Sequence, residues 1–146
     1  MTKEAEIWMD KKIDNLLIII GQAMVNRAKY YCTVATGRLR DSITFATSTE
    51  QSGIDGKATE SDKIKQPSEA RTVRIGTAVD YALGVEFGTR PHIIEPKTAK
   101  ALYWKGAEHP VKRVKHPGTI SQPFLRPALL TTNIKGIINK TGIFKA

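Results

Sequence analysis

Apolar side chains recur at intervals of three and four along the first 35 residues, at Met9, Ile13, Leu16, Leu17, Ile20, Met24, Ala28 and Tyr31. This spacing lines one face of a 3.6-residue repeat and predicts a helix over residues 3–35. Such a helix would be about 50 Å long at ~1.5 Å per residue, which exceeds the ~30 Å width of a small domain. We therefore expect one end to pack on something other than its own core. A helix broken near Gly21 is the alternative.

The pattern changes after Thr36 and Gly37, where glycine suits the end of a helix. Apolar positions from Leu39 to Phe45 predict a strand over about 41–49, and the alternation around Val73 and Ile75 predicts a second strand over 71–77. Residues 50–70 are polar and have no periodic apolar face. They predict a long mobile loop at the tip of a β-hairpin.

A short apolar segment over 80–87 predicts a helix that Gly88 caps. Six of the seven prolines lie between 91 and 127 and divide that region into short pieces. Residues 92–94 and 101–104 predict two strands joined by a turn at Pro96 and Lys97, and residues 111–116 predict a basic strand or extended arm. A last helix is expected to start near Pro123, to hold Pro127 in its first turn and to end at Gly142.

This order of elements predicts an α+β fold in a single domain spanning residues 1–146. It combines a long N-terminal helix, a small antiparallel sheet with a long mobile loop at 50–70, a short middle helix and a C-terminal helix. The length of 146 residues suits one domain. The longest apolar run, residues 16–20, is too short to cross a bilayer, and the acidic residues before it are unlike a secretory signal. We expect a soluble cytoplasmic or particle-bound protein.

The positive charge is concentrated in one segment. The chain carries 23 Lys and Arg against 14 Asp and Glu, and residues 90–126 hold eight of the former and two of the latter. A clustered excess indicates a polyanionic neighbour, although a solvated basic face with no ligand is the alternative. Lysines alternate here with Tyr103 and Trp104. We expect these aromatic side chains to lie in the core rather than to stack on bases.

Catalytic and metal-binding patterns are weak in this sequence. The spacing of His92, His109 and His116 does not place two imidazoles on one helix face, so we expect no metal. One cysteine, Cys32, excludes an internal disulfide and is expected to be a buried apolar residue. Asp80 and Glu86 would point to different sides of a short helix, which favours a solvated or capping role over acid–base catalysis. We expect neither enzymatic activity nor a cofactor, with a small hydrolase or nuclease kept as an alternative.

Four short motifs occur in a fixed order along the chain. They are residues 36–43 (TGRLRDSI), 80–92 (DYALGVEFGTRPH), 116–119 (HPGT) and 122–129 (QPFLRPAL). From about Thr36 to Leu130 this succession resembles the "gene product ten" family of tail components of long-tailed phages and prophages. The residues that we assign to fold-defining or interface roles from this resemblance are Gly37, Leu39, Tyr81, Glu86, Phe87, Gly88, Thr89, Pro91, His92, Pro117, Gly118, Pro123, Phe124, Leu125 and Pro127.

The resemblance implies a structural protein of the virion, at the neck between head and tail. Such proteins assemble as closed rings, usually of six or twelve subunits, between a head-closure or adaptor ring and the tail terminator or tail tube. The double-stranded genome passes through transiently, and no membrane is involved. Before assembly the protein would reside in the host cytoplasm. The candidate DNA-facing cations are Lys105, Lys112, Arg113 and Lys115. A small basic nucleic-acid-binding protein is the alternative function.

Overall fold

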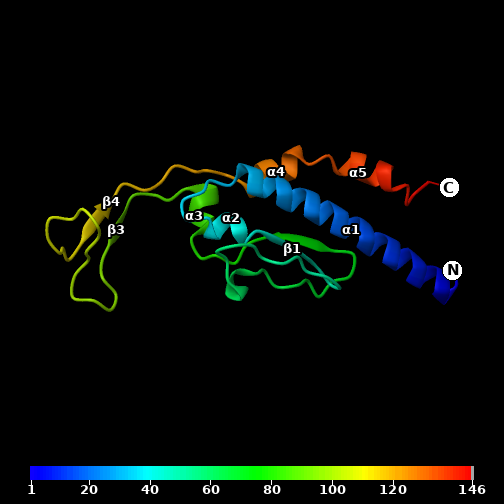
Figure 1. Ribbon diagram of the computed structural model, residues 1–146, viewed down its shortest axis with the longest axis horizontal. Coiled ribbons are helices and arrows are strands. Elements are labelled where there is room, and N and C mark those ends of the chain that lie inside the picture. Colours follow the sequence, from blue (N-terminus) through cyan, green and yellow to red (C-terminus); the bar gives the residue numbers. More distant parts are fainter. Residues whose placement is uncertain (146) are drawn as a thin grey trace.

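Helix α1 (Lys3–Tyr31) is the longest element and runs along the whole body of the molecule (Figure 1). The computed structural model describes residues 1–145. The helix continues through Gly21, so the alternative of a break there is wrong. It ends at Tyr31 rather than at residue 35, and its 29 residues span about 43 Å. The first buried residue is Leu16, and the turns before it project past the core with Ile7 and Trp8 exposed.

The main core lies between helix α1 and a two-stranded antiparallel sheet. Strands β1 (Thr44–Thr47) and β2 (Val73–Gly76) pair with Phe45 opposite Ile75. Phe45 packs so closely on Gly21 that no larger residue fits beneath it. A second, smaller core gathers Leu16, Ile20 and Met24 against isoleucines of the C-terminal segment. The main core contains Val25, Ala28, Cys32, Leu39, Ile43, Phe45, Val79, Ala82, Phe124 and Ala128.

The first predicted strand is shorter than expected because its first residues form a helical turn instead. Helix α2 (Arg38–Asp41) follows Gly37, whose φ of +91° supplies the left-handed turn that leads into it. Strand β1 then has every residue buried instead of alternating. The reason is that residues after it fold back onto it: the Ser52 N–H donates to the Phe45 carbonyl at 3.0 Å, and the Gln66 side chain donates to the Thr47 carbonyl at 3.1 Å.

Segment 50–70 connects the two strands of the β1–β2 hairpin, as predicted, and it packs on the body. Asp62, in the short 3-10 helix η1 (Glu60–Asp62), is buried and binds the Arg38 guanidinium through both carboxylate oxygens, at 2.6 and 3.0 Å. The Arg38 hydrogen bonds, with a further one from the Thr59 N–H, hold the pKa of Asp62 well below its usual range. Lys29 of α1 forms an ion pair with Asp55. Polar contacts therefore fasten a segment that has almost no apolar face.

A second hairpin leaves the body after helix α3 (Ala82–Phe87), which Gly88 ends with a φ of +73° as expected. Strand β3 (His92–Ile94) pairs with β4 (Val114–His116), so the basic segment is a strand. The predicted strand over 101–104 is wrong: in that stretch only Leu102 pairs, in an isolated bridge with Val111. Pro96 and Pro110 flank the intervening segment and cannot donate to a continuous ladder.

The predicted C-terminal helix is two helices, α4 (Leu125–Thr131) and α5 (Ile134–Thr141). Between them the Thr132 hydroxyl donates to the Ala128 carbonyl at 2.6 Å, and the Asn133 side chain accepts from the Gly136 N–H at 2.8 Å. Threonine and asparagine thus end one helix and cap the next. Pro127 lies in the first turn of α4, as predicted. The fold is α+β, with two small antiparallel sheets rather than one, and no helix within residues 1–145 is long and apolar enough to span a membrane.

The contact between Gly21 and Phe45 gives a direct test of the main core. A Cβ at position 21 would lie 2.8 Å from the Phe45 Cγ. Gly21→Ala should therefore lower the free energy of unfolding by about 1–3 kcal/mol through overpacking, although alanine favours a helix by ~1 kcal/mol. Urea denaturation measures the change. Asn15→Ala, at an exposed position of the same helix, should be neutral or slightly stabilising. A Gly21→Ala variant as stable as the wild type would contradict this packing.

Candidate functional site at the root of the arm

Residues 89–119 form an arm that projects from the body at the end opposite the two chain termini (Figure 1). Within the arm, His92 lies opposite His116 and Ile94 opposite Val114. The two imidazole rings stack with their centroids 4.9 Å apart. Among the described residues, the arm makes its backbone pairs only with itself, and these include the pair of Thr89 and Thr119 at its root. Its direction is therefore determined where it joins the body.

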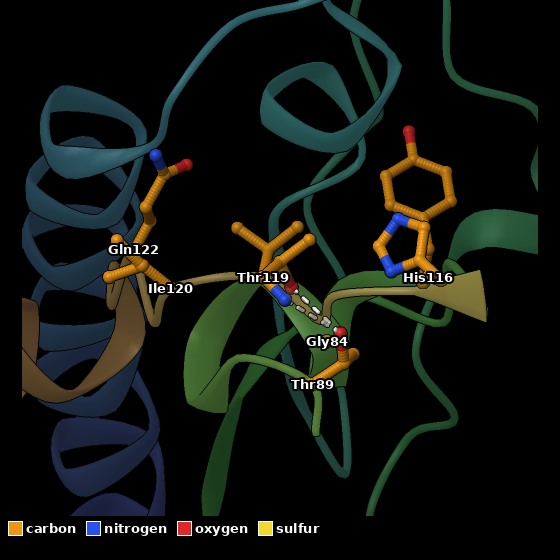
Figure 2. A pocket seen from close by; sticks show the side chains of 8 residues that line it. Gly84, Thr89, His116, Thr119, Ile120 and Gln122 are labelled. Carbon is orange, nitrogen blue, oxygen red and sulfur yellow. Dashed lines mark hydrogen bonds between the residues drawn. The ribbon is translucent and has the colours of Figure 1, made fainter. Parts of the chain in front are cut away.

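The root is a clamp between Thr89 and Thr119 (Figure 2). Each backbone N–H donates to the carbonyl of the other residue, at 3.0 and 3.1 Å, and the two hydroxyls lie 3.0 Å apart. Gly88 and Gly118 flank this bridge with φ values of +73° and +84°. A Cβ on Gly88 would lie 2.6 Å from the Thr119 carbonyl oxygen, and one on Gly118 would clash with the Thr89 carbonyl. Only glycine allows the two segments to approach this closely.

Glu86 connects the root to helix α4. The residue is 3% exposed, and its carboxylate accepts hydrogen bonds from the N–H groups of Phe124, Leu125 and Arg126 at 2.7–3.0 Å. These N–H groups at the start of a helix have no intrahelical partner, so the carboxylate satisfies them and the adjacent helix dipole. The sequence prediction of a capping role for Glu86 is confirmed. Asp80, by contrast, is exposed.

Arg126 completes the connection. Its Nε donates to the Glu86 carboxylate at 3.2 Å, and its Nη2 donates to the Glu86 carbonyl at 3.1 Å. The guanidinium also lies 4.9 Å from the centre of the Phe87 ring. Burial alone would raise the pKa of Glu86, but the hydrogen bonds from three backbone N–H groups and from Arg126 outweigh it and lower that pKa. The carboxylate is charged and fully used in holding the structure.

A groove runs beside the root, between α3 and the segment that returns from the arm. One part, of about 570 Å³, is lined by residues that include Tyr81, Val85, Thr119 and Gln122 (Figure 2). A second part, of about 360 Å³, shares Tyr81, Val85 and Gln122 and extends to residues 33–37 and Leu39. All four motifs of the sequence therefore meet at the root and its groove.

The predicted motif residues divide by position. Leu39, Glu86 and Phe124 are buried, whereas Tyr81 and Phe87 are exposed. Thr89, Pro91, His92, Pro117 and Gly118 belong to the arm near its root, and Gly37, Gly88, Pro123, Leu125 and Pro127 lie in the turns and first helical positions that lead into α2, out of α3 and into α4.

The predicted cations lie on the arm. Lys105, Lys112, Arg113 and Lys115 are all exposed, and Arg113 forms a cross-strand ion pair with Glu95 at 2.7 Å. Residues 89–119 hold seven Lys and Arg against two Glu. The structure thus gathers the excess charge on one projecting element.

The prediction that Tyr103 and Trp104 are core residues is wrong. Their side chains are 69% and 49% exposed. Within residues 1–145 the arm is a two-stranded hairpin with no second layer over it, so neither hydrophobic core cluster includes its apolar side chains. The prediction failed because a strand with one face buried in a core shows the same alternation of aromatic and basic residues as this exposed segment.

Other side chains that catalysis or metal binding would use are dispersed or structural. In the part of the chain that the structure describes, residues 1–145, no three His, Cys, Asp or Glu side chains are close enough to hold a metal ion. Cys32 is buried as expected, and burial raises the pKa of its thiol. Ser121 and Arg126 were not among the predicted site residues. Their bonds to Glu86 cross 35 and 40 positions of sequence, which no local pattern could indicate.

Comparisons with protein-family models, with curated proteins and with solved structures found no match for this chain. The resemblance of the four motifs to the phage tail-component family therefore stays a prediction. The geometry gives a physical reason for the motifs to occur together, because all four contribute residues to the arm root or to the groove beside it.

The charge on Glu86 makes the stability of this joint dependent on pH. A carboxyl whose pKa is lowered by folding contributes stability above its unfolded pKa of about 4.3, and that contribution is lost as the pH falls through the lower folded value. Glu86→Gln should cost about 2–3 kcal/mol of unfolding free energy at pH 7. The deficit should shrink below about pH 4. Denaturant titrations at several pH values measure both.

Glu108→Gln is the matched control, since Glu108 is exposed on the arm. It should leave stability within about 0.5 kcal/mol of wild type. A Glu86→Gln deficit of the same size at pH 3 and pH 7 would count against a charge-dependent cap.

Proposed function

We propose that this chain is a structural subunit of a phage head–tail junction, in a neck or tail-completion ring through which the genome passes. The observation that carries the proposal is the joint at the arm root. The motifs that resemble the tail-component family are distributed over more than ninety residues of sequence, yet all four contribute residues to the arm root or to the groove beside it. In a family of structural proteins, whose function depends on their shape, we expect the residues that build such a shared unit to be kept.

Exposed apolar residues support a role in assembly. A ring subunit needs two different surfaces, because one patch meets a different patch of its neighbour. This chain exposes apolar side chains in separate places: Ile7 and Trp8 on α1, Leu83 and Phe87 on α3, Leu129 and Leu130 on α4, and Tyr103 and Trp104 on the arm. Single exposed apolar residues are ordinary, but neighbouring exposed pairs favour contacts with other chains.

The charge of the arm supports contact with DNA. Lys105, Lys112 and Lys115 are solvent-exposed, and they lie on a hairpin rather than on a helix shaped for the major groove. Such cations attract phosphates without reading sequence, which suits a duplex that must slide past. In the proposed ring these residues would screen the genome in the lumen.

A nucleic-acid-binding protein that acts as a free monomer is the second candidate. The exposure of Tyr103 and Trp104 beside Lys105 favours it, since aromatic rings next to cations stack on unpaired bases. The two functions differ in what the isolated chain does, so each has its own test.

The first test is the position of the chain in particles. An antibody against the chain, detected by gold labelling in electron micrographs of purified phage, should mark the junction of head and tail. Deleting the gene should give filled heads and separate tails that do not join, and a plasmid copy should restore infectious particles. Label on the tail tip or absent from particles, or normal infectious yield from the deletion, would exclude the proposal.

The second test is the affinity of the isolated chain for DNA. As a ring subunit it should bind short duplex weakly, with a dissociation constant of roughly 10⁻⁴–10⁻⁶ M at physiological salt. Lys112→Glu with Lys115→Glu should weaken that binding severalfold and flatten its salt dependence, as fluorescence anisotropy would measure. Lys135→Glu with Lys140→Glu on α5 is the charge-matched control. Nanomolar binding, or a strong preference for single strands, would favour the monomeric nucleic-acid-binding protein.

A further inference from the structure

The arm lacks a packing partner within the described residues of its own chain. Neither core cluster includes a residue from 89–119. A two-stranded hairpin is marginally stable by itself in water, and it gains stability when a further layer covers it. The arm nevertheless carries the exposed pair Tyr103 and Trp104, together with Ile93. These side chains would be buried if another molecule covered the arm.

The arm cannot find that cover by folding back on its own body. The Thr89–Thr119 bridge ties its two strands together at the root. Directly after the arm, the Ser121 hydroxyl donates to the Glu86 carbonyl at 2.7 Å and the Gln122 N–H donates to the Val85 carbonyl at 2.8 Å, which attaches the returning strand to α3. Figure 1 shows the arm leading away from α3 and α4. A contact between the arm tip and a body surface must therefore be made between two molecules.

The body offers a fitting surface, which we call the α3–α4 hollow. It has a volume of about 520 Å³, and its lining includes Asp80, Leu83, Phe87, Leu125 and Arg126. Leu83 is 71% exposed and Phe87 60% exposed, so the hollow opens onto an apolar surface. The Asp80 carboxylate is exposed beside it. One oxygen of this carboxylate accepts from the Tyr81 N–H at 3.0 Å, and the Arg126 guanidinium in the lining is paired with Glu86. Apolar walls beside an exposed carboxylate complement an aromatic side chain next to a cation.

We propose that the arm tip, Tyr103 to Lys105, docks in the α3–α4 hollow of a second copy of this chain. Trp104 fills the hollow against Leu83 and Phe87, and Lys105 pairs with Asp80. This inference rests on the proposed ring function and names the contact between its subunits.

A second copy fits better than a polyanion at these residues. Phosphates would engage the lysines along the arm, but they would leave Trp104 without an apolar site. Each copy carries both an arm and a hollow, so every molecule can give one contact and receive another. Repeated head to tail, such a contact closes a ring if the rotation allows it.

The test uses two variants with opposite defects, studied by sedimentation and native mass spectrometry. Trp104→Ala damages the arm and leaves the hollow, whereas Leu83→Glu damages the hollow and leaves the arm. Wild type should form species larger than dimers as concentration rises. Each variant alone should associate at least tenfold more weakly. An equimolar mixture should form dimers and stop there, because only one complementary contact remains.

Matched controls separate this contact from general surface effects. Tyr30→Ala removes an aromatic side chain of α1 at a residue that is 81% exposed, and Ile19→Glu charges an exposed apolar position of the same helix. Both should associate as wild type does. All four variants should keep the wild-type melting temperature, since every substituted side chain is exposed.

Several outcomes would overturn the inference. They are wild-type protein that stays monomeric up to about 1 mM, a Trp104→Ala or Leu83→Glu variant that associates normally, a mixture that forms no dimer, or a control that fails equally. A Trp104→Ala defect in DNA binding without any self-association would assign the arm tip to nucleic acid instead. Gold labelling away from the head–tail junction together with dimers in the mixture would refute the proposed function and keep the contact, so the two failures are distinguishable.

Discussion

One buried carboxylate organises the junction between the body and the arm. Glu86 reaches from the end of α3 to the first N–H groups of α4, nearly forty residues later in sequence. Removing a charge from water is costly, and here three backbone donors and a guanidinium compensate for that cost. Because the residue after next, Gly88, begins the arm root, the same contact that starts α4 also positions the arm. Core, groove and arm depend on this single site.

The larger elements could be predicted from the sequence because each depends on a local pattern. The 3–4 spacing predicted α1, alternation at Val73 and Ile75 predicted β2, and glycine chemistry predicted the end of α3 at Gly88. Errors arose where local patterns are ambiguous. An extended apolar pattern after Gly37 concealed the helical turn α2, and Thr132 with Asn133 divided a periodic segment into two helices. Such errors leave the predicted fold class unchanged, but they change which strands are predicted to pair.

The candidate site was predictable only in part, for a related reason. Its glycines, prolines and Glu86 were identified through motifs. The residues that they contact lie 30 to 40 positions away in the sequence, so the contacts themselves could not be predicted. The same applies to segment 50–70, whose composition suggests disorder. One Arg38–Asp62 pair with two-point geometry, buried on the carboxylate side, ties it to the body. The composition shows that the segment lacks an apolar face, but it cannot show that one of its carboxylates pairs with an arginine of the body.

The separation of arm and core has an evolutionary consequence. Since neither hydrophobic cluster contains a residue from 89–119, substitutions there need not preserve any interior packing. Lengthening the hairpin, recharging it or exchanging its aromatic tip would leave the scaffold intact as long as the two root glycines and their threonine bridge persist. Related proteins could therefore diverge in what they touch while remaining alike in how they fold.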